Sequence, residues 1–455
     1  MHYANNLLDT IGHTPLVKLN RVTQGIKATV LAKVEFFNPG ASVKDRPAIH
    51  MIEDAEAKGL LKPGGTIVEP TSGNTGVGLA IACAIKGYRC VFTMPDKMSQ
   101  EKRDVLRAYG AEVVITPTSV ANDHPDSYYS VANRLTREIP DAYQPNQFHN
   151  AKNPEAHYLT TGPELWEQTA GTITHYVSAM GTGGTISGAA KYIKEQNGRV
   201  VVVGVDPEGS IYSGDTPKPY QIEGIGMNYI PDTVDLRLID RYERVGDAEA
   251  FAMTRRLARE EGILAGGSSG AAVVAALRVA RDLPADAVVV VLLPDSGRGY
   301  VSKIFNDEWM KQHGFIESPR HSVMVGSLLA ARGARSSLIA VKPAEPVANA
   351  VEQLREHGIS QLPVMDGDEV VGSVQESTLL KAIVEGAGAT KTVAEVMGRP
   401  YAVVDEAESV SKVYEALLRG DGAVVVAKAG RPHGVLTKID LIEFFASSQQ
   451  VGVTV

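Results

Sequence analysis

Short apolar runs alternate with amphipathic stretches between about residues 65 and 293. Runs rich in β-branched residues predict six strands: Thr66–Glu69, Cys90–Met94, Glu112–Ile115, His175–Ala179, Val200–Val205 and Ala287–Leu293. Apolar positions at helical spacing predict helices between them: Gly76–Lys86, Ser99–Ala108, Glu155–Gln168, Gly184–Glu195 and Ala248–Glu260. The run VVVVLL is apolar on both faces, as in strands buried within a parallel sheet. The pattern therefore predicts an open α/β architecture, which binds ligands at the carboxyl ends of its strands.

A second region, after about residue 336, contains an internal repeat. Similar residues recur at a spacing of 62: Val341 and Val403, Val364 and Val426, Gly372 and Gly434, Leu379 and Leu441. Each copy is predicted to contain a strand, a helix, two strands and a second helix, and two such small units should pack on each other. The predicted organisation is a domain at 1–313, a linker at 314–335 and a tandem module at 336–455, with repeats at about 336–390 and 391–448.

Composition and charge narrow the class of protein. Hydrophobic residues make up 44% of the 455 positions and charged residues 22%, which is typical of a globular chain. The net charge of −8 argues against nucleic acid as the main partner. Two cysteines, Cys83 and Cys90, are too few to form a disulfide framework, and no Cys/His cluster indicates a metal site. The N-terminus lacks a signal-peptide pattern and no apolar run is long enough to span a membrane, so we expect a cytoplasmic protein.

Three glycine-rich loops lie where a predicted strand gives way to a helix. They are PTSGNTG at 70–76, MGTGGT at 180–185 and GGSSG at 266–270. Exposed N–H groups at a helix N-terminus bind anions, and hydroxyl side chains add hydrogen-bond donors. Two or three such loops in one fold favour a ligand that carries both a phosphate and a carboxylate.

Other glycine motifs fit the sequence less well. No GxxxxGK[ST] occurs, and Ile186 occupies the place of the third glycine of GxGxxG. GGSSG does match the GxSxG elbow of serine hydrolases, with Asp295 and His313 or His321 following Ser268 in the order of a triad. Because the preceding segment Gly262–Ala265 is a poor strand and no HGGG motif is present, the hydrolase is the lesser alternative.

Lys44 stands just before a predicted helix, Ala48–Lys58, and follows the loop NPGASV at 38–43. The positive end of a helix dipole lowers the pKa of a lysine and favours a neutral, nucleophilic amine. Most lysines are instead solvated surface charges, and the local pattern leaves both interpretations open.

Several segments together resemble a known family. Gly12–Leu16, Gly40–Arg46, Pro70–Gly76 and Gly181–Thr185 are similar to the pyridoxal-phosphate enzymes of tryptophan-synthase-β type. Within that group, DPEGS at 206–210, EGIG at 223–226 and LPDS at 293–296 resemble the cystathionine β-synthase family more than the cysteine synthases. The C-terminal repeat resembles that family's tandem CBS (Bateman) module. The resemblance implies pyridoxal-phosphate fold type II, with two open parallel-sheet subdomains. GHTPL begins at residue 12, so the haem-binding extension of animal members is not expected, nor is haem.

The resemblance also assigns roles to individual residues. Lys44 would hold pyridoxal 5'-phosphate as a Schiff base and move the Cα proton. The other implied cofactor contacts are Asn74, Gly181, Thr182, Gly183, Gly184, Thr185, Ser268, Pro294 and Asp295. The implied substrate contacts are Thr71, Ser72, Thr75, Gln147 and Gly224. The implied reaction is a β-replacement that joins L-serine and L-homocysteine to L-cystathionine, in transsulfuration and cysteine biosynthesis. A cysteine synthase that uses O-acetylserine and sulfide is the alternative.

Two departures concern the first substrate. Phe148 stands where the family usually has tyrosine, and Met227 stands where eukaryotic members have another tyrosine. Without these two phenols the substrate entrance is less polar, which leaves serine and O-acetylserine both open as first substrate.

The tandem module carries a candidate regulatory site. Thr437 and Asp440 lie at a predicted strand-to-helix junction, where they could offer a hydroxyl and a carboxylate to an adenosine-type ligand such as S-adenosylmethionine. Ile359 and Ser360 would face that ligand, and because the first repeat has no aspartate at the equivalent place, one site per chain is expected. Thr and Asp are also routine helix N-caps, so a module that binds nothing is the alternative. A homodimer or higher homo-oligomer is expected.

Overall fold

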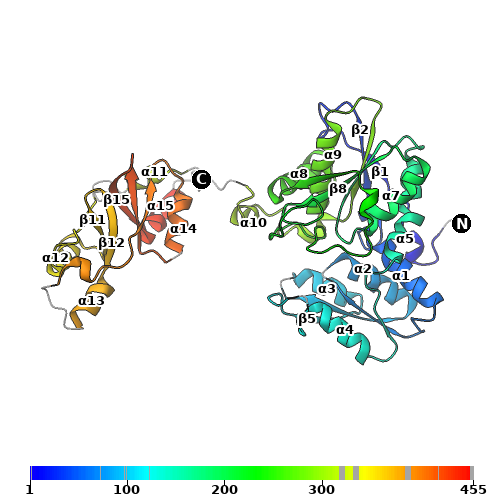
Figure 1. Cartoon of the computed structure of the whole chain (residues 1–455), viewed down its shortest axis with the longest axis horizontal. Coiled ribbons are helices and arrows are strands. Elements are labelled where there is room, and N and C mark those ends of the chain that lie inside the picture. The colour runs from blue at the N-terminus through cyan, green and yellow to red at the C-terminus, as the bar shows by residue number, and fades with distance from the viewer. Residues whose placement is uncertain are drawn as a thin grey trace. The chain divides into compact units, whose positions relative to one another are not determined.

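A computed structural model of the chain divides into two compact units, residues 1–315 and 316–455, which are described separately (Figure 1). The structure describes residues 1, 3–71, 73–96, 98, 100–121, 123–316, 323–331, 338–384, 391–418 and 420–450, with side chains up to residue 444 in the last helix. Among these residues, no helix is both long and apolar enough to cross a membrane.

The larger sheet of the first unit has the strand order β1-β2-β10-β7-β8-β9, and all neighbours are parallel except the β1–β2 pair. Its strands are β1 (Leu16–Lys18), β2 (Thr29–Val34), β7 (His175–Ala179), β8 (Val201–Pro207), β9 (Arg241–Val245) and β10 (Val288–Leu293). Helices lie on both sides of it: α5 (Lys152–Leu159), α6 (Thr161–Gln168), α7 (Gly184–Gln196), α8 (Asp247–Glu260) and α9 (Gly267–Ala280). In Figure 1, α8 and α9 are seen on one side and α5 and α7 on the other, which is why β10 is apolar on both faces.

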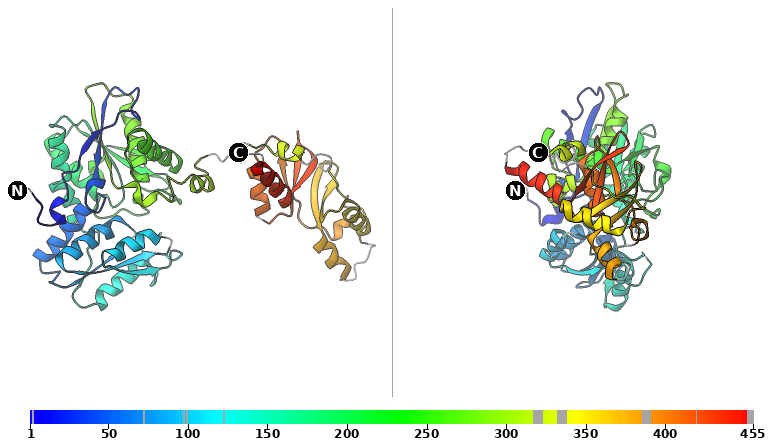
Figure 2. Two further views of the ribbon diagram at one scale, coloured as in Figure 1. Left: turned by 180° about the vertical axis from the view of Figure 1, so that it is seen from behind. Right: turned by 90° about the vertical axis from the view of Figure 1, so that its left-hand side faces the viewer.

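The smaller sheet is fully parallel and has the order β5-β4-β3-β6 (Figure 2). Its strands are β3 (Thr66–Pro70), β4 (Arg89–Pro95), β5 (Glu112–Thr116) and β6 (Ala142–Tyr143). The helices of this region are α1 (Asp45–Ala57), α2 (Asn74–Lys86), α3 (Gln100–Ala108) and α4 (Tyr128–Glu138). Helices α1 and α2 pack so closely that a Cβ on Gly78 would lie 2.9 Å from Ala48 Cβ. This contact brings the starts of both helices together.

The predicted architecture is confirmed, and all six predicted strands are present with bounds that shift by at most two residues. The helix predicted over Glu155–Gln168 is wrong as a single element. It is two helices, α5 and α6, because Thr160 leaves the helical region with φ −125° and ψ −66°. Strands β1, β2, β6 and β9 and helix α4 were not predicted.

The second unit contains the repeat. The first copy holds α12 (Val347–His357), β11 (Gln361–Asp366), β12 (Glu369–Gln375) and α13 (Glu376–Val384). The second holds β13 (Ala402–Asp405), α14 (Val410–Leu418), β14 (Ala423–Lys428), β15 (Arg431–Thr437) and α15 (Lys438–Gln450). The β11–β12 and β14–β15 hairpins share a register irregularity, which follows Val364 in the first and Val426 in the second. The 62-residue spacing is therefore kept even at the bulge.

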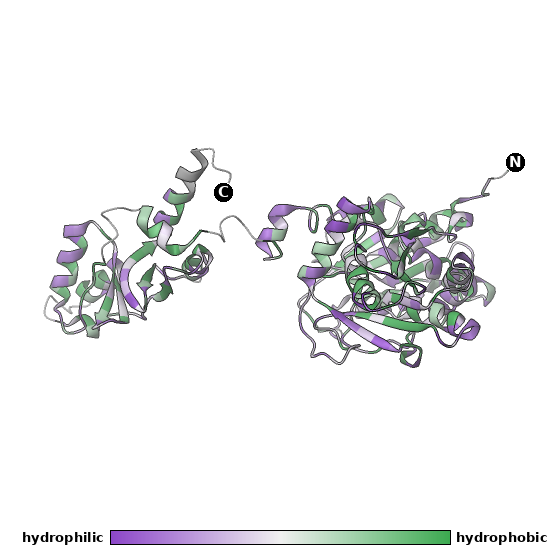
Figure 3. Ribbon diagram, turned by 90° about the horizontal axis from the view of Figure 1, so that it is seen from above, coloured by the Kyte–Doolittle hydropathy of each residue, from purple (hydrophilic) through white to green (hydrophobic). Residues whose placement is uncertain are grey.

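The hydrophobic core of each repeat includes residues from outside that repeat. Helix α11 (Val325–Ala331), inside the segment predicted as a linker, packs Leu328 and Leu329 into the core of the second repeat. Val393, at the start of the second repeat, packs into the core of the first. Apolar residues occupy the interior strands of both units, as the green ribbon segments in Figure 3 show.

Candidate functional site

A small cavity lies in the first unit at the carboxyl ends of β7 and β10. Residues from four separate loops line it, and seven of them were singled out in the sequence: Lys44, Gly181, Thr182, Gly183, Thr185, Gly224 and Pro294. This is the position that an open parallel sheet predicts for a ligand.

Lys44 is held in the cavity wall by backbone hydrogen bonds between its loop and the end of β10. Val43 N donates to Pro294 O at 2.8 Å, and Ser296 N donates to Ala41 O at 3.1 Å. Burial lowers the pKa of Lys44, although the nearby carboxylates act in the opposite direction. A lysine with a lowered pKa is more often neutral and is therefore a better nucleophile.

The loop between β7 and α7 needs its glycines. Gly183 has φ +80°, a conformation that favours glycine, and a Cβ there would overlap Val234. A Cβ on Gly181 would lie 2.5 Å from Gly224 O, and one on Gly184 would overlap the Asn153 side chain. The first turn of α7 begins at this loop, and its N–H groups have no partners within the helix. The end of the cavity at this loop therefore fits a phosphate.

Asn74 begins α2 beside the smaller sheet, Asp295 follows β10 of the larger sheet, and the two side chains contact each other across the cleft between these subdomains. Asn74 Nδ2 donates to Asp295 Oδ2 at 2.9 Å, and the Tyr300 hydroxyl donates to the same oxygen at 2.7 Å. Burial raises the pKa of Asp295, while the two hydrogen bonds lower it. Asp295 Oδ1 is buried without a hydrogen-bond partner. The contact ties the start of α2 to the end of β10.

The structure does not support the hydrolase alternative. Ser268 is buried in the first turn of α9, and Asp295 accepts from Asn74 and Tyr300 rather than from a histidine. His313 Nδ1 instead lies 2.8 Å from Trp309 O, and His321 lies outside the described residues. Within the described part of the chain, no three His, Cys, Asp or Glu side chains are grouped so as to hold a metal ion.

The loop between β3 and α2 presents hydroxyl groups. Thr71 Oγ1 accepts from Gly73 N at 3.4 Å and from Gly76 N at 3.2 Å, and Ser72 lies outside the described residues. Thr75 Oγ1 donates to Gln147 Oε1 at 2.6 Å. The predicted substrate residues Thr75 and Gln147 are thus in direct contact.

Glu69 was missed in the sequence although it holds the segment that carries Gln147. Its carboxylate accepts from Asn146 N at 2.8 Å and from Gln147 N at 3.1 Å. Burial raises the pKa of Glu69 to about 7, against the effect of the two N–H donors. The available signal was a carboxylate within a strand whose other residues, TIVP, are apolar or small.

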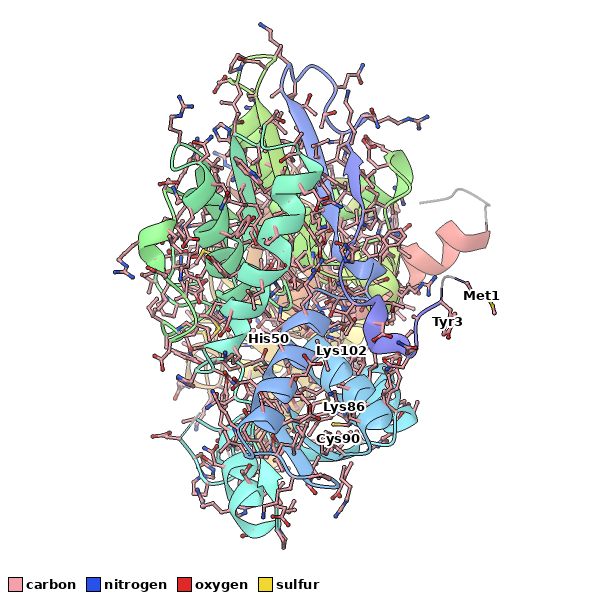
Figure 4. The ribbon with its side chains drawn as sticks, turned by 90° about the vertical axis from the view of Figure 1, so that its right-hand side faces the viewer. Met1, Tyr3, His50, Lys86, Cys90 and Lys102 are labelled. Carbon is pink, nitrogen blue, oxygen red and sulfur yellow. The ribbon has the colours of Figure 1, made fainter. Side chains whose placement is uncertain are left out.

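A chain of charges across the cleft was also missed. Glu223, next to Gly224, accepts from Lys102 of α3 and from Lys303 Nζ at 2.6 Å. Lys102 Nζ also lies 5.3 Å from the ring centroid of Tyr300. Figure 4 labels Lys102 near the level where the upper, green part and the lower, blue part of the first unit meet. We call Lys102, Glu223 and Lys303 the cleft bridge, because it joins α3 to the loops of the larger sheet.

A second charge network lies behind Lys44. Arg46 Nε donates to Glu35 Oε2 at 2.7 Å, and Arg46 Nη1 donates to Glu164 Oε1 at 2.7 Å. Lys33 Nζ donates to Glu164 Oε2 at 2.6 Å. Although burial alone would raise it, the hydrogen bonds and charge of Arg46, together with Lys33, lower the pKa of Glu164 to about 2. This buried network fixes the first turn of α1, directly after Lys44.

In the second unit, Thr437 and Asp440 bond to each other. Thr437 N and Oγ1 donate to Asp440 Oδ2 at 2.6 Å and 2.7 Å, in the manner of a cap on α15. Gln361 Nε2 donates to Gly422 O at 2.7 Å. Gln361 follows Ile359 and Ser360, and Gly422 precedes Ala423, the strand partner of Thr437. The predicted regulatory residues of the two repeats therefore lie at neighbouring strand ends.

Comparisons with known proteins identify two families along the chain. Residues 7–295 match the model for "Pyridoxal-phosphate dependent enzyme", and residues 329–385 and 393–447 each match the model for "CBS domain". The chain is 42% identical to a cystathionine β-synthase of Dictyostelium discoideum over 98% of its own length and 93% of that protein.

Shorter relatives match about two thirds of the chain. A cysteine synthase of Staphylococcus aureus is 48% identical over 66% of the chain and 96% of that protein. The solved structure of an O-acetylserine-dependent cystathionine β-synthase from Helicobacter pylori is 41% identical, with a TM-score of 0.63, over 67% of the chain and 99% of that structure.

Proposed function

The chain belongs to the pyridoxal-phosphate dependent enzymes and, within them, to the cystathionine β-synthases, and on this premise we propose that it joins L-serine and L-homocysteine to form L-cystathionine. The observation that carries the proposal is the shared cavity, where the buried Lys44 meets the glycine loop at the N-terminus of α7. That arrangement brings together an amine of lowered pKa and a phosphate-binding helix end.

The residues around the cavity fit pyridoxal phosphate. When bound, this cofactor supplies an electron sink for loss of the Cα proton and of the β-substituent. The Lys44 amine would hold the cofactor and then carry the proton to and from Cα. Gly181, Thr182, Gly183, Gly184 and Thr185 would hold the phosphate. Asn74 and Ser268 would contact the ring, beside Pro294 and Asp295.

The first substrate would bind between the two subdomains. Thr71, Ser72 and Thr75, at the start of α2, would hold its carboxylate, and Gln147 would fix the hydroxyl of Thr75. Phe148, which packs against the rings of Tyr129 and Tyr229, gives the entrance an apolar surface. We propose that this surface admits both serine and O-acetylserine.

The deciding experiment is a product assay that crosses serine or O-acetylserine with homocysteine or sulfide. The proposed function requires cystathionine as the main product whenever homocysteine is present. Lys44→Ala should abolish turnover in every combination, while the fold survives. Cysteine formed from O-acetylserine and sulfide, with homocysteine ignored, would favour the cysteine synthase instead. An absorption spectrum of the purified enzyme tests the expected absence of haem.

We further propose that the tandem module binds one adenosine-type ligand per chain, with S-adenosylmethionine as the first candidate. Asp440, whose carboxylate caps α15, would exchange its bond to Thr437 for the ribose hydroxyls. Calorimetry with S-adenosylmethionine, AMP and ATP should find one site, and Asp440→Ala should weaken binding at least about tenfold. Two sites per chain, or undiminished binding to the variant, would contradict this. Sedimentation should find a homodimer or a higher homo-oligomer.

A further inference from the structure

His157 is a buried histidine whose imidazole lies between two threonine hydroxyls. Its Nδ1 is 2.8 Å from Thr161 Oγ1, and its Nε2 is 3.2 Å from Thr185 Oγ1. Thr185 belongs to the cavity wall, whereas His157 lies in α5 and does not line the cavity. We propose that His157 is a positioning residue that orients the Thr185 hydroxyl toward the phosphate of the cofactor. The inference rests on the proposed function, because it requires pyridoxal phosphate in the cavity.

The imidazole is neutral. Burial lowers the pKa of His157 well below its ordinary value, and the positive charges of Arg46 and Lys44 act in the same direction. A neutral imidazole has one N–H donor and one acceptor nitrogen, and its neighbours decide which nitrogen carries the hydrogen.

The direction of the hydrogen bonds follows from the single hydroxyl hydrogen of Thr185. To donate that hydrogen to a phosphate oxygen, the threonine oxygen must accept from His157 Nε2–H. His157 Nδ1 then accepts from the Thr161 hydroxyl. The three side chains thus form one directed chain of donors that leads from α6 through α5 to the cavity.

The packing of α5 on α7 keeps the imidazole in place. A Cβ on Gly188 of α7 would lie 2.8 Å from His157 Cβ and would overlap Pro154 O. The backbones of the two helices are therefore in close contact, and a larger residue at 188 would require α5 to shift.

Asn153, one turn before His157 in α5, makes a similar contact with the phosphate loop. Its Nδ2 donates to Thr182 Oγ1 at 3.1 Å and to Gln147 O at 2.8 Å. Asn153 and His157 are four residues apart and so share one face of α5. That face therefore contacts both hydroxyl side chains of the phosphate loop.

The test compares His157→Gln with His157→Leu. Glutamine can place an amide N–H near the position of Nε2, whereas leucine fills the space without a donor. Each apoprotein is titrated with pyridoxal phosphate by fluorescence, and the bound phosphate is followed by ³¹P NMR. The leucine variant should bind the cofactor about tenfold more weakly, as expected for one lost hydrogen bond to a group near a charge. Its ³¹P resonance should shift, and the glutamine variant should stay within about threefold of the parent.

A double-mutant cycle with Thr185→Val separates positioning from packing. If His157 acts through Thr185, His157→Leu should cause no further loss of affinity in the Thr185→Val background. An equal loss in both backgrounds, an unchanged ³¹P resonance, or a glutamine variant as weak as the leucine variant would overturn the assignment. A parent protein that takes up no pyridoxal phosphate would overturn both this inference and the proposed function. Uptake with a wrong product would overturn only the latter.

Discussion

The buried network behind Lys44 and the cleft bridge are built from the same chemical parts in different surroundings. In each, a carboxylate lies between two cationic side chains. The side chains of Lys33, Glu35, Arg46 and Glu164 are 0–11% exposed, whereas those of the cleft bridge are 19–33% exposed. Removing one partner from a buried pair leaves an unpaired charge in a medium of low polarity. A partly exposed pair is screened by water, so the loss of one partner costs less.

Position separates the two networks further. The buried network joins α1, α6 and the end of β2, and none of its four residues lines the cavity. The cleft bridge joins α3 to Glu223 and Lys303. We infer that the first network fixes the start of α1 beside Lys44, and that the second can exchange partners when a charged ligand enters.

Breaking the buried network should have the largest effect on stability. Glu35→Gln leaves the Arg46 guanidinium under-paired, so the free energy of unfolding should fall by about 3–5 kcal/mol. Urea denaturation of the apoprotein measures this. Glu35→Leu combined with Arg46→Met removes both charges and should cost less than Glu35→Gln alone. A loss below about 1 kcal/mol for Glu35→Gln would show that the buried network contributes no more to stability than a surface ion pair.

The pH dependence of stability should distinguish the networks next. Because the folded-state pKa of Glu164 is about 2, below its ordinary value of 4.5, its contribution is present above pH 4.5 and is lost as the pH falls toward 2. The loss should reach at most about 3 kcal/mol. Urea midpoints at a series of pH values should fall more steeply for the parent than for Glu164→Gln. Parallel curves would contradict the assigned pKa.

Breaking the cleft bridge should change access to the site more than stability. Glu223→Gln should alter the free energy of unfolding by less than about 1 kcal/mol. Hydroxylamine should nevertheless remove the bound cofactor about two- to fivefold faster, because the cleft opens more often. High salt should bring the parent toward the variant, since it screens exposed pairs. Equal removal rates at low salt would show that the bridge does not restrain the cleft.

An exposed pair far from both networks should give the smallest effect. Lys62 Nζ contacts Asp141 Oδ1 at 2.6 Å, and the two side chains are 67% and 51% exposed. Lys62→Ala should change the free energy of unfolding by less than about 0.5 kcal/mol and leave activity unaltered. The same urea titrations provide this measurement, and a larger change would mean that burial is not what separates the networks.

The sequence predicted those parts of the fold in which the hydrophobicity of the residues matches their burial. VVVVLL of β10 is apolar on both faces and was predicted as a buried strand. Strand β9, RYERV, lies at the sheet edge and has no clear pattern. Strand β2 carries the buried Lys33, which resembles a surface residue until its partner Glu164, distant in sequence, is seen beside it.

The candidate site divides in the same way. Lys44 and the glycine loop at 181–185 stand in contiguous motifs, so the family resemblance named them, and the structure brings both to one cavity. No local motif marks Glu69, Asn153 or His157. Each contacts residues that are distant from it in the sequence. They could be found only from the packing of α5 on α7 and from the contact of Glu69 with Asn146 and Gln147.

The parallel pairing of β2 with β10 has a consequence for the order in which the protein is made. Val34 pairs with Leu293, so a ribosome that adds about 5–20 residues per second must continue for roughly 10–50 s after β2 before its partner is synthesised. The smaller sheet, between residues 66 and 143, is complete long before then. Until β10 emerges, the loop of Lys44 has no Pro294 to bond with and β2 has an unpaired edge. Between residues 143 and 293 the nascent chain thus carries a finished smaller sheet and an unfinished cavity, so a chain that stops before β10 should lack the complete cavity.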